Sequence, residues 1–450
     1  MNFDTHRAGL LLHPTSLPSG TLADVDRWLD FLQAAGGSVW QMLPLGIPLT
    51  GLSPYQCASA FAVDPGLFPD VSADMRGFAD WHRRQAHWLD DFARFMVIKS
   101  EQGTASWTTW PAPLRDRDER TLAAFDISHA DKLKAVMVEQ YGAAMHWQGI
   151  RERAAARGIQ LFGDMPIFVA HDSADVWAQR GQFLLDAAGE PTVVAGVPPD
   201  YFSETGQRWG NPHYDWNAMQ ADGFAWWRAR LRAHFEWFDL VRIDHFRGLA
   251  ASWTIPASEP TAILGEWVEA PGAALLQAIA DEQGELPLVA EDLGIITSDV
   301  TALRHQFGLP GMAVLQFAFD AHADNPHKPE NVQPDTVYYT GTHDNDTTLG
   351  WWQALPDEAR QQVMRQLGVA EPDAVPDAML DTVLQSRAAL AILPMQDVMR
   401  LGSEARMNTP GTDNGNWTWR FDWDELPSDL ASRLLEKIQK AHRCETRTQP

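Results

Sequence analysis

The chain has 450 residues, 45% of them hydrophobic, so it can bury a large core and fits one barrel with insertions. Its 60 acidic residues outnumber 35 basic ones, and the net charge of −25 argues against nucleic acid and membrane partners and favours a neutral substrate. Only two cysteines, Cys57 and Cys444, are present, which argues against a disulfide framework or a zinc site and suits a reducing cytoplasm.

The N-terminal segment MNFDTHRAG carries Asp4 and has no apolar stretch of the kind found in signal peptides. No window of the chain approaches the roughly 20 apolar residues of a membrane span. These features predict a soluble, cytoplasmic protein.

A repeated unit then follows along the chain: an amphipathic helical stretch, a Gly, Pro or acidic break, and a short apolar run that ends in a polar residue or proline. Helices are predicted at residues 26–35, 131–157, 224–238, 272–283 and 298–307, with a closing helix at 424–442. Strands are predicted at GLLLHP (9–14), SVWQMLPLG (38–46), IQLFGDMPIFVA (159–170), LVRIDHF (240–246), LVAEDLG (288–294), MAVLQFAFD (312–320), VYYTGTHD (337–344) and LAILPMQD (390–397). Eight strands separated by helices predict an α/β fold, a (β/α)8 TIM barrel.

An open doubly wound sheet is the alternative architecture, because it also alternates strands and helices. It needs a Gly-rich phosphate turn after the first strand, and HPTSLPSG is not one. We expect residues 1–450 to form a single catalytic barrel, with insertions at about 49–130 and 171–222 that build substrate walls over the C-terminal rim. Residues 196–216, rich in Pro, Gly and aromatics, are predicted to form an ordered loop.

Three of the predicted strands end in carboxylates, at Asp244, Glu291 and Asp344. The C-terminal ends of barrel strands meet at one rim, so these groups are expected to share a site. Two carboxylates that flank a glycosidic bond can act as nucleophile and general acid/base, and a separation of about 5 to 5.5 Å gives retention of configuration. Arg242 lies on the same strand face as Asp244 and favours its ionised form, which leaves Glu291 as the better acid.

Two other interpretations stay open for these residues. Each carboxylate alone could be a capping or solvated residue at a strand-to-helix junction. A metal site is also conceivable, although no H-x-H or H-E-x-x-H spacing supports it and Arg242 is unfavourable beside a cation. The available oxygen and nitrogen ligands for such a site are His245, His343, Asp344, Asp346 and Asp292.

Several motifs between about residue 9 and residue 420 carry a family resemblance. They are GLLLHPTSLPSG, SPYQ, GDMPIFVA, SETGQRWGNP, VRIDHFRG, AEDLG, THDND, GSEARMN and GNW. In this combination the chain resembles the 4-alpha-glucanotransferases called amylomaltases or disproportionating enzymes, of the alpha-amylase superfamily. The resemblance implies a (β/α)8 barrel and transfer of alpha-1,4-glucan segments between maltooligosaccharides, with no cofactor and no metal.

By the same resemblance, Asp244 corresponds to the nucleophile, Glu291 to the acid/base and Asp344 to a carboxylate that binds sugar hydroxyls in the transition state. The resemblance also implies substrate-binding roles for Arg242, His343, Asp164, Tyr55, Trp209, Glu204 and Asp320. Tyr55 is the aromatic expected beside the reacting ring, and Trp209 an acceptor-side platform. Core packing of Tyr55 or Trp209, and a salt bridge or loop hydrogen bond of Glu204 or Asp320, are the plainer alternatives.

The chain departs from the family pattern in places expected to line the substrate walls. The stretch near Leu52 lacks an aromatic, the segment at about 72–110 is abbreviated, and His171 and Ser252 replace an acidic residue and a tyrosine. These changes affect the expected chain-length preference and a secondary glucan site, and they leave the reaction type unchanged.

Two other functions compete with glucan transfer. An alpha-glucan hydrolase would use the same carboxylates. Incubation with a maltooligosaccharide would distinguish hydrolysis from transfer by the products formed. A catalytically silent carbohydrate-binding barrel would be expected to have lost at least one carboxylate, and all three are present.

Overall fold

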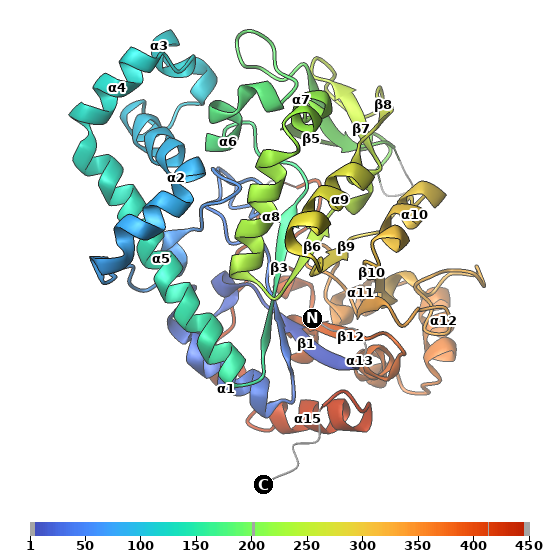
Figure 1. The fold of residues 1–450 in the computed structure, drawn as a ribbon. Helices are drawn as coiled ribbons and strands as arrows, with labels where there is room; N and C mark the ends of the chain where they lie inside the picture. The colour runs from blue at the N-terminus through green and yellow to red at the C-terminus, as the bar shows by residue number, and fades with distance from the viewer. Residues whose placement is uncertain (1–4, 200–202, 413, 445–450) are drawn as a thin grey trace.

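The computed structural model describes residues 5–199, 203–412 and 414–444. Eight parallel strands form a barrel at the centre of the molecule, with helices outside it (Figure 1). The strands are β1 (Arg7–Leu11), β2 (Val39–Gln41), β3 (Gln160–Pro166), β6 (Leu240–Asp244), β9 (Leu288–Ala290), β10 (Gly311–Val314), β11 (Thr336–Tyr339) and β12 (Leu390–Pro394). Each lies in or overlaps one of the eight predicted strand segments, so the predicted barrel is confirmed.

The strands follow the order β10-β11-β12-β1-β2-β3-β6-β9, and neighbouring strands are hydrogen-bonded in parallel. Between β9 and β10, one of the hydrogen bonds is made by a side chain rather than by the main chain. The Ala290 N–H donates to Pro310 O at 2.9 Å, and the Met312 N–H donates to the side chain of Asp292 at 2.7 Å. A carboxylate therefore takes part in closing the barrel.

The helices that alternate with the strands match the predicted ranges to within one residue. They are α1 (Val25–Ala34), α5 (Ala130–Ala156), α8 (Ala225–Trp237), α9 (Gly272–Gln283) and α10 (Ser298–Gln306). Further helices near the C-terminal strands are α11 (Thr348–Ala354), α12 (Asp357–Leu367), α13 (Val375–Gln385) and α14 (Met395–Val398). Within the described ranges, none of the helices is both long and apolar enough to cross a membrane.

The closing helix is shorter than predicted. It is α15 (Leu430–Lys440), preceded by a 3-10 turn at Trp423–Glu425 rather than beginning at residue 424. Pro427 lies between the two and cannot occupy a helix interior, which explains the separate start. Helix α15 lies below the barrel near the chain's C-terminal end (Figure 1).

The two long insertions contain most of the remaining structure. Helices α2 (Phe78–Glu101), α3 (Ala112–Arg115) and α4 (Glu119–Ser128) belong to the first insertion and lie to one side of the barrel (Figure 1). The second insertion contains α6 (Ala174–Ala178) and α7 (Trp216–Ala221).

A second sheet was not predicted. It has four antiparallel strands in the order β5-β4-β7-β8, formed by β4 (Val193–Val197), β5 (Gln207–Pro212), β7 (Ala251–Pro256) and β8 (Glu266–Glu269). The prediction of a loop over residues 196–216 was therefore wrong for residues 196–197, which belong to β4, and for residues 207–212, which form β5. Gly196, Gly210 and Pro212 break the alternation of apolar and polar residues by which strands are recognised.

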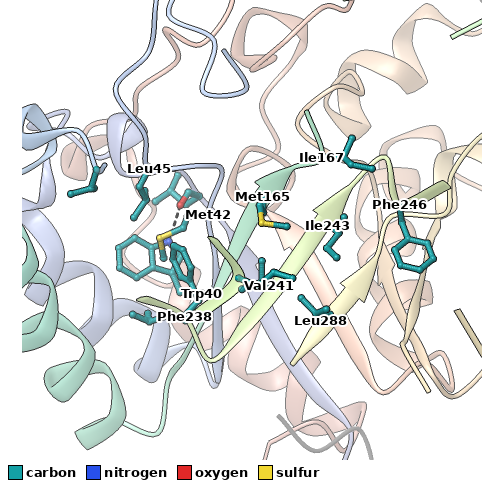
Figure 2. Close-up of a cluster of buried hydrophobic side chains, with 14 of the residues drawn as sticks. Trp40, Met42, Leu45, Met165, Ile167, Phe238, Val241, Ile243, Phe246 and Leu288 are labelled. Atoms are coloured by element: carbon teal, nitrogen blue, oxygen red, sulfur yellow. Dashed lines mark hydrogen bonds between the residues drawn. The ribbon is translucent and has the colours of Figure 1, made fainter. Parts of the chain in front are cut away.

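Alternation along the barrel strands separates two apolar layers. Side chains that fill the barrel interior include Leu11, Val39, Phe162, Leu240, Val289, Met312, Val314, Val337, Tyr339, Leu390 and Ile392. The outward layer packs against the helices, and Figure 2 shows Val241 and Ile243 of β6 beside Met165 of β3 and Leu288 of β9. Since successive side chains alternate, Arg242 and Asp244 lie on the interior side, above Leu240.

Candidate active site

A buried cation lies at the rim of the barrel between two strands. Arg242 of β6 is 5% exposed, and its Nη1 lies 2.5 Å from Asp164 Oδ2 on the neighbouring strand β3. Its Nη2 lies 2.6 Å from Asp244 Oδ1, at the end of its own strand. The Asp164 side chain is fully buried, whereas that of Asp244 is 30% exposed. The guanidinium thus fixes one buried carboxylate and one that is open to a ligand.

Tyr55 joins this cluster from the loop after β2. Its hydroxyl donates to Asp164 Oδ2 at 2.7 Å, and its ring stacks on that of His343, with centroids 5.2 Å apart. Burial, together with the negative charge of Asp164, raises the pKa of Tyr55 well above its usual value, so the phenol keeps its proton and remains a donor. The structure therefore brings together Tyr55, Asp164, Arg242 and His343.

The carboxylate of Glu291 is directed toward the end of β6. Its Oε2 accepts the His245 N–H at 2.7 Å, and its Oε1 accepts the Leu293 N–H at 3.0 Å. His245 has a φ of 53°, a left-handed conformation that is uncommon for a residue with a side chain. This turn directly after Asp244 presents the His245 N–H to Glu291. The end of β6, with Asp244, and the end of β9, with Glu291, therefore lie next to each other.

The electrostatics of the two carboxyls reflect their surroundings. Burial raises the pKa of Asp244 well above its usual value; Arg242 opposes the shift, while Asp164, Glu291 and Asp344 add to it. Burial likewise raises the pKa of Glu291, against the effect of Arg242 and of its two backbone donors. Because each negative charge disfavours the other, the pair favours a state in which one carboxyl is ionised and the other is protonated.

Asp344 lies in the turn after β11 and is 46% exposed. Its Oδ1 accepts a hydrogen bond of 2.6 Å from Asn408 Nδ2 and lies 3.3 Å from His343 Nε2, while Arg406 donates to its backbone carbonyl at 2.6 Å. Burial lowers the pKa of His343, which favours the neutral ring. Sequence reasoning assigned no role to Asn408 or Arg406, although both belong to the GSEARMN motif.

Two tryptophans border the cluster. Trp209 of β5 packs edge-to-face on His245, with ring centroids 4.8 Å apart and an angle of 90°, and it is half-buried. Trp417, which sequence reasoning also missed, lies 5.9 Å from Tyr55 and 5.9 Å from His343 between ring centroids. The GNW motif was the available signal for it.

Two of the predicted substrate contacts, Glu204 and Asp320, are not tied to this cluster by any hydrogen bond or ion pair among the described residues. Glu204 is exposed in a turn beside residues outside the described ranges. Asp320 is 43% exposed, accepts the His322 N–H at 3.1 Å and lies 3.7 Å from Lys328 Nζ. Among the described residues, no hydrogen bond or ion pair joins either side chain to Asp244, Glu291 or Asp344.

The positions that depart from the family pattern have local contacts. Leu52 is 55% exposed in a left-handed turn, the His171 ring donates to Gly189 O at 2.7 Å, and Ser252 Oγ donates to Gly248 O at 3.0 Å. As for the alternative metal site, the described part of the chain holds no group of three or more His, Cys, Asp or Glu arranged to bind a metal ion.

A model of the 4-alpha-glucanotransferase family matches the chain in two parts, residues 11–73 and 68–424. The two matches overlap at residues 68–73, and the chain at and just after this overlap is hydrogen-bonded to α5. His146 of α5 donates to Ser72 O and Tyr141 donates to Asp74 O, both at 2.9 Å, and any side chain at Gly142 would overlap the carbonyl of Val71. The family match therefore divides at a short, closely packed connection.

The chain is similar to curated proteins over nearly its whole length. The 4-alpha-glucanotransferase of Thermus thermophilus is 46% identical over 492 aligned positions that cover 97% of this chain and 98% of the relative. The alignment is longer than this 450-residue chain, so the relative has residues that the chain lacks. The 4-alpha-glucanotransferase of Synechocystis is 42% identical, with 96% and 97% covered.

Among solved structures, the amylomaltase of Streptococcus agalactiae, in complex with acarbose, superimposes with a TM-score of 0.94 at 31% identity. The superposition covers 98% of this chain and 100% of that one. With a family match over most of its length and relatives above 40% identity, the chain belongs to the 4-alpha-glucanotransferase family.

Proposed function

We propose that this protein transfers alpha-1,4-glucan segments between maltooligosaccharides through a covalent glycosyl-Asp244 intermediate. The observation that carries the proposal is the hydrogen bond from the backbone of His245, next to Asp244, to the carboxylate of Glu291. It brings a nucleophile and an acid/base group from two strands to one rim. The family membership supports glucan transfer over hydrolysis.

In the first step, an Asp244 oxygen forms a bond to the anomeric carbon of the donor while the bond from that carbon to the leaving oxygen breaks. Glu291 gives its proton to the leaving oxygen, and the shortened glucan departs. In the second step, Glu291 takes the proton of an acceptor hydroxyl, whose oxygen displaces Asp244 from the anomeric carbon. Two inversions give net retention of configuration.

The charges around the two carboxyls support this division of roles. Arg242 contacts Asp244 directly at 2.6 Å and compensates its negative charge, which favours the ionised nucleophile. Burial raises the pKa of both carboxyls, so the ion pair is what distinguishes them. Glu291 forms no ion pair with any of the described residues, which favours it as the protonated acid. The mechanism needs no cofactor and no metal.

The remaining roles concern the substrate. We assign Asp344 to the hydroxyls of the reacting sugar, because its carboxylate is held by Asn408 yet is 46% exposed. Tyr55 and Trp209 offer aromatic faces or edges to sugar rings. Arg242, His343 and Asp164 shape the same subsite, and Glu204 and Asp320 are proposed as contacts further along the glucan.

At the level of the whole chain, we propose one catalytic barrel whose insertions, at about 49–130 and 171–222, form the walls of the glucan groove. The acarbose complex of the Streptococcus agalactiae relative supports binding of maltooligosaccharide-like ligands. A cytoplasmic location fits a chain with two cysteines in 450 residues. The charge of −25 favours a neutral glucan over nucleic acid or an anionic membrane as partner.

Incubation with pure maltotriose tests the proposal. Transfer yields glucose together with oligomers longer than maltotriose, whereas glucose and maltose without longer products would show hydrolysis and overturn it. Asp244→Asn and Glu291→Gln are expected to abolish transfer and to leave the circular dichroism spectrum unchanged. Asp429→Asn and Glu436→Gln, near and on the distant helix α15, are matched controls that should transfer normally. Transfer near the unmodified rate by Asp244→Asn or Glu291→Gln would remove that residue from the mechanism.

A further inference from the structure

The barrel closes in an unusual way next to Glu291. Strand β9 has only three residues, Leu288–Ala290, and Glu291 follows it directly. Where a backbone carbonyl would continue the pairing with β10, the carboxylate of Asp292 accepts the N–H of Met312 at 2.7 Å instead. A side chain thus takes the place of a main-chain acceptor one residue after Glu291.

This carboxylate is held from a second direction by helix α10. Arg304 Nε lies 3.3 Å from Asp292 Oδ2, and the same guanidinium donates to Leu309 O at 2.9 Å and contacts Asp335 Oδ2 at 3.2 Å. The side chains of Asp292 and Arg304 are 16% and 10% exposed, whereas that of Asp335 is 51% exposed. Arg304 therefore has one largely buried acidic partner and one exposed one.

Gly311 provides the space that the carboxylate occupies. A Cβ at this position of β10 would lie 2.6 Å from Asp292 Oδ2 and 2.9 Å from Oδ1, closer than real Cβ contacts come. Three elements thus fit around one side chain: an N–H donor on β10, a cation on α10 and a glycine that leaves room.

We infer that Asp292 is a positioning residue that fixes the Glu291 carboxyl opposite Asp244; this inference rests on the acid/base role proposed above. On the β6 side, the main chain of Glu291 is already held: its N–H donates to Ile243 O and its carbonyl accepts the Phe246 N–H, both at 3.1 Å. Asp292 supplies the corresponding attachment on the β10 side. Without it, the residue that carries the proton is anchored from one side only.

The charge of Asp292 has a second consequence, because it raises the pKa of Glu291. Removing the charge lowers that pKa, so Glu291 loses its proton at lower pH and the alkaline limb of the pH profile moves to lower pH. The ionisable groups that face this pair from the packed elements are Arg242 and Asp244 on β6, Arg304 and His305 on α10, and Asp335 before β11.

The test compares Asp292→Asn with Asp335→Asn, which removes the other acidic partner of Arg304. An asparagine side chain can still accept from Met312, so the Asp292→Asn protein is expected to fold. It loses the negative charge that strengthens this hydrogen bond and pairs with Arg304, so the attachment to β10 is weakened. We expect a loss in kcat for maltotriose of about tenfold, with KM changed less than about twofold, and an alkaline limb at lower pH. With alpha-maltosyl fluoride, whose leaving group needs no proton, the loss in the rate of fluoride release is expected to be smaller. Gly311→Ala displaces the Asp292 carboxylate but keeps its charge, so it should give a similar loss in kcat with a smaller shift of the alkaline limb. Asp335→Asn should match the unmodified protein.

The outcomes separate this inference from the proposed function. Equal losses with both donors and an unmoved alkaline limb in Asp292→Asn, while Glu291→Gln is inactive on maltotriose, would overturn the positioning role alone. Normal transfer by Glu291→Gln would overturn the acid/base assignment and this inference with it. If Asp335→Asn changes kcat and the alkaline limb as much as Asp292→Asn does, the effect comes from disturbing Arg304 rather than from Asp292 itself. This result would also overturn the inference.

Discussion

The guanidinium of Arg242 lies 2.6 Å from the carboxylate of Asp244, two residues further along the same strand and on the same side of the barrel wall. The same guanidinium lies 2.5 Å from the fully buried side chain of Asp164. The one cation therefore lowers the pKa of a partly exposed carboxyl and neutralises a fully buried one, and these two effects are separable by experiment.

Replacing Arg242 with Gln is expected to move the acidic limb of the kcat/KM profile to higher pH. Arg242 lowers the pKa of Asp244, so its loss raises that pKa, and a nucleophile that must be ionised then needs a higher pH. Arg242→Lys keeps a positive charge and should move the limb less. Kinetics with maltotriose across the pH range measure this, and an unmoved limb in the Gln variant would show that Asp244 is not the ionised nucleophile.

The same Arg242→Gln substitution leaves Asp164 as a buried carboxylate that still accepts a hydrogen bond from Tyr55 but has lost its cation. We expect the free energy of unfolding at neutral pH to fall by about 3–5 kcal/mol, because a buried charge loses its partner. Urea denaturation measures the loss. A companion Asp164→Asn substitution should recover part of it by removing the uncompensated charge, and a double variant no more stable than the single one would contradict this account.

Asn408→Ala is expected to reduce kcat/KM for maltotriose by about tenfold, since the exposed carboxylate of Asp344 loses the 2.6 Å hydrogen bond that orients it. Asn416→Ala is the matched control. Asn416 accepts the Thr409 N–H at 2.9 Å and supports the same loop, and its side chain bonds within that loop rather than to Asp344. If both variants lose activity equally, the loop as a whole, rather than the bond to Asp344, carries the effect.

Trp209→Ala is expected to lower the ratio of transfer to hydrolysis on maltotriose. The indole packs against His245, the residue after Asp244. If Trp209 is the acceptor-side platform proposed above, its removal admits water and weakens binding of the acceptor. Release of new reducing ends, relative to longer oligomers formed, measures the ratio. Trp267→Ala, on the outer strand β8 of the same sheet and 39% exposed, should leave it unchanged. An unaltered ratio in Trp209→Ala would assign that tryptophan to packing alone.

Arg443→Met is expected to destabilise the protein without changing KM. Arg443 is buried beneath the barrel and donates to the carbonyls of Leu384, Arg7 and Ser386, the last two at 2.9 and 2.7 Å. Losing these bonds leaves carbonyls without a donor and should lower the free energy of unfolding by about 3 kcal/mol. Thermal unfolding of the two proteins, with KM for maltotriose measured in parallel, gives both quantities.

The sequence allowed the barrel and its carboxylates to be predicted because both depend on local patterns. Short apolar runs ending in charged residues define β6, β9 and β11, and any eight such strands bring their ends to one rim. The β5-β4-β7-β8 sheet was missed because its strands are interrupted by Gly and Pro and because its two halves are joined by the long-range pairing of β4 with β7. Asn408 was missed for a similar reason, since its partner Asp344 lies 64 residues away in the chain.

The position of Glu291 illustrates the same limit at closer range. Its motif placed it at the rim, but its orientation depends on the left-handed turn at His245 and on the attachment of Asp292 to β10. Neither has a sequence signal of its own, because a positive φ outside glycine and a carboxylate that replaces a carbonyl both follow from tertiary packing.

The close approach of Val71 to Gly142 has a practical meaning for protein engineering. A chimaera that grafts a longer relative's extra segment between residues 68 and 73 must first lift this stretch off helix α5, which exposes the bare backbone at Gly142. The graft therefore has to bring its own cover for that helix.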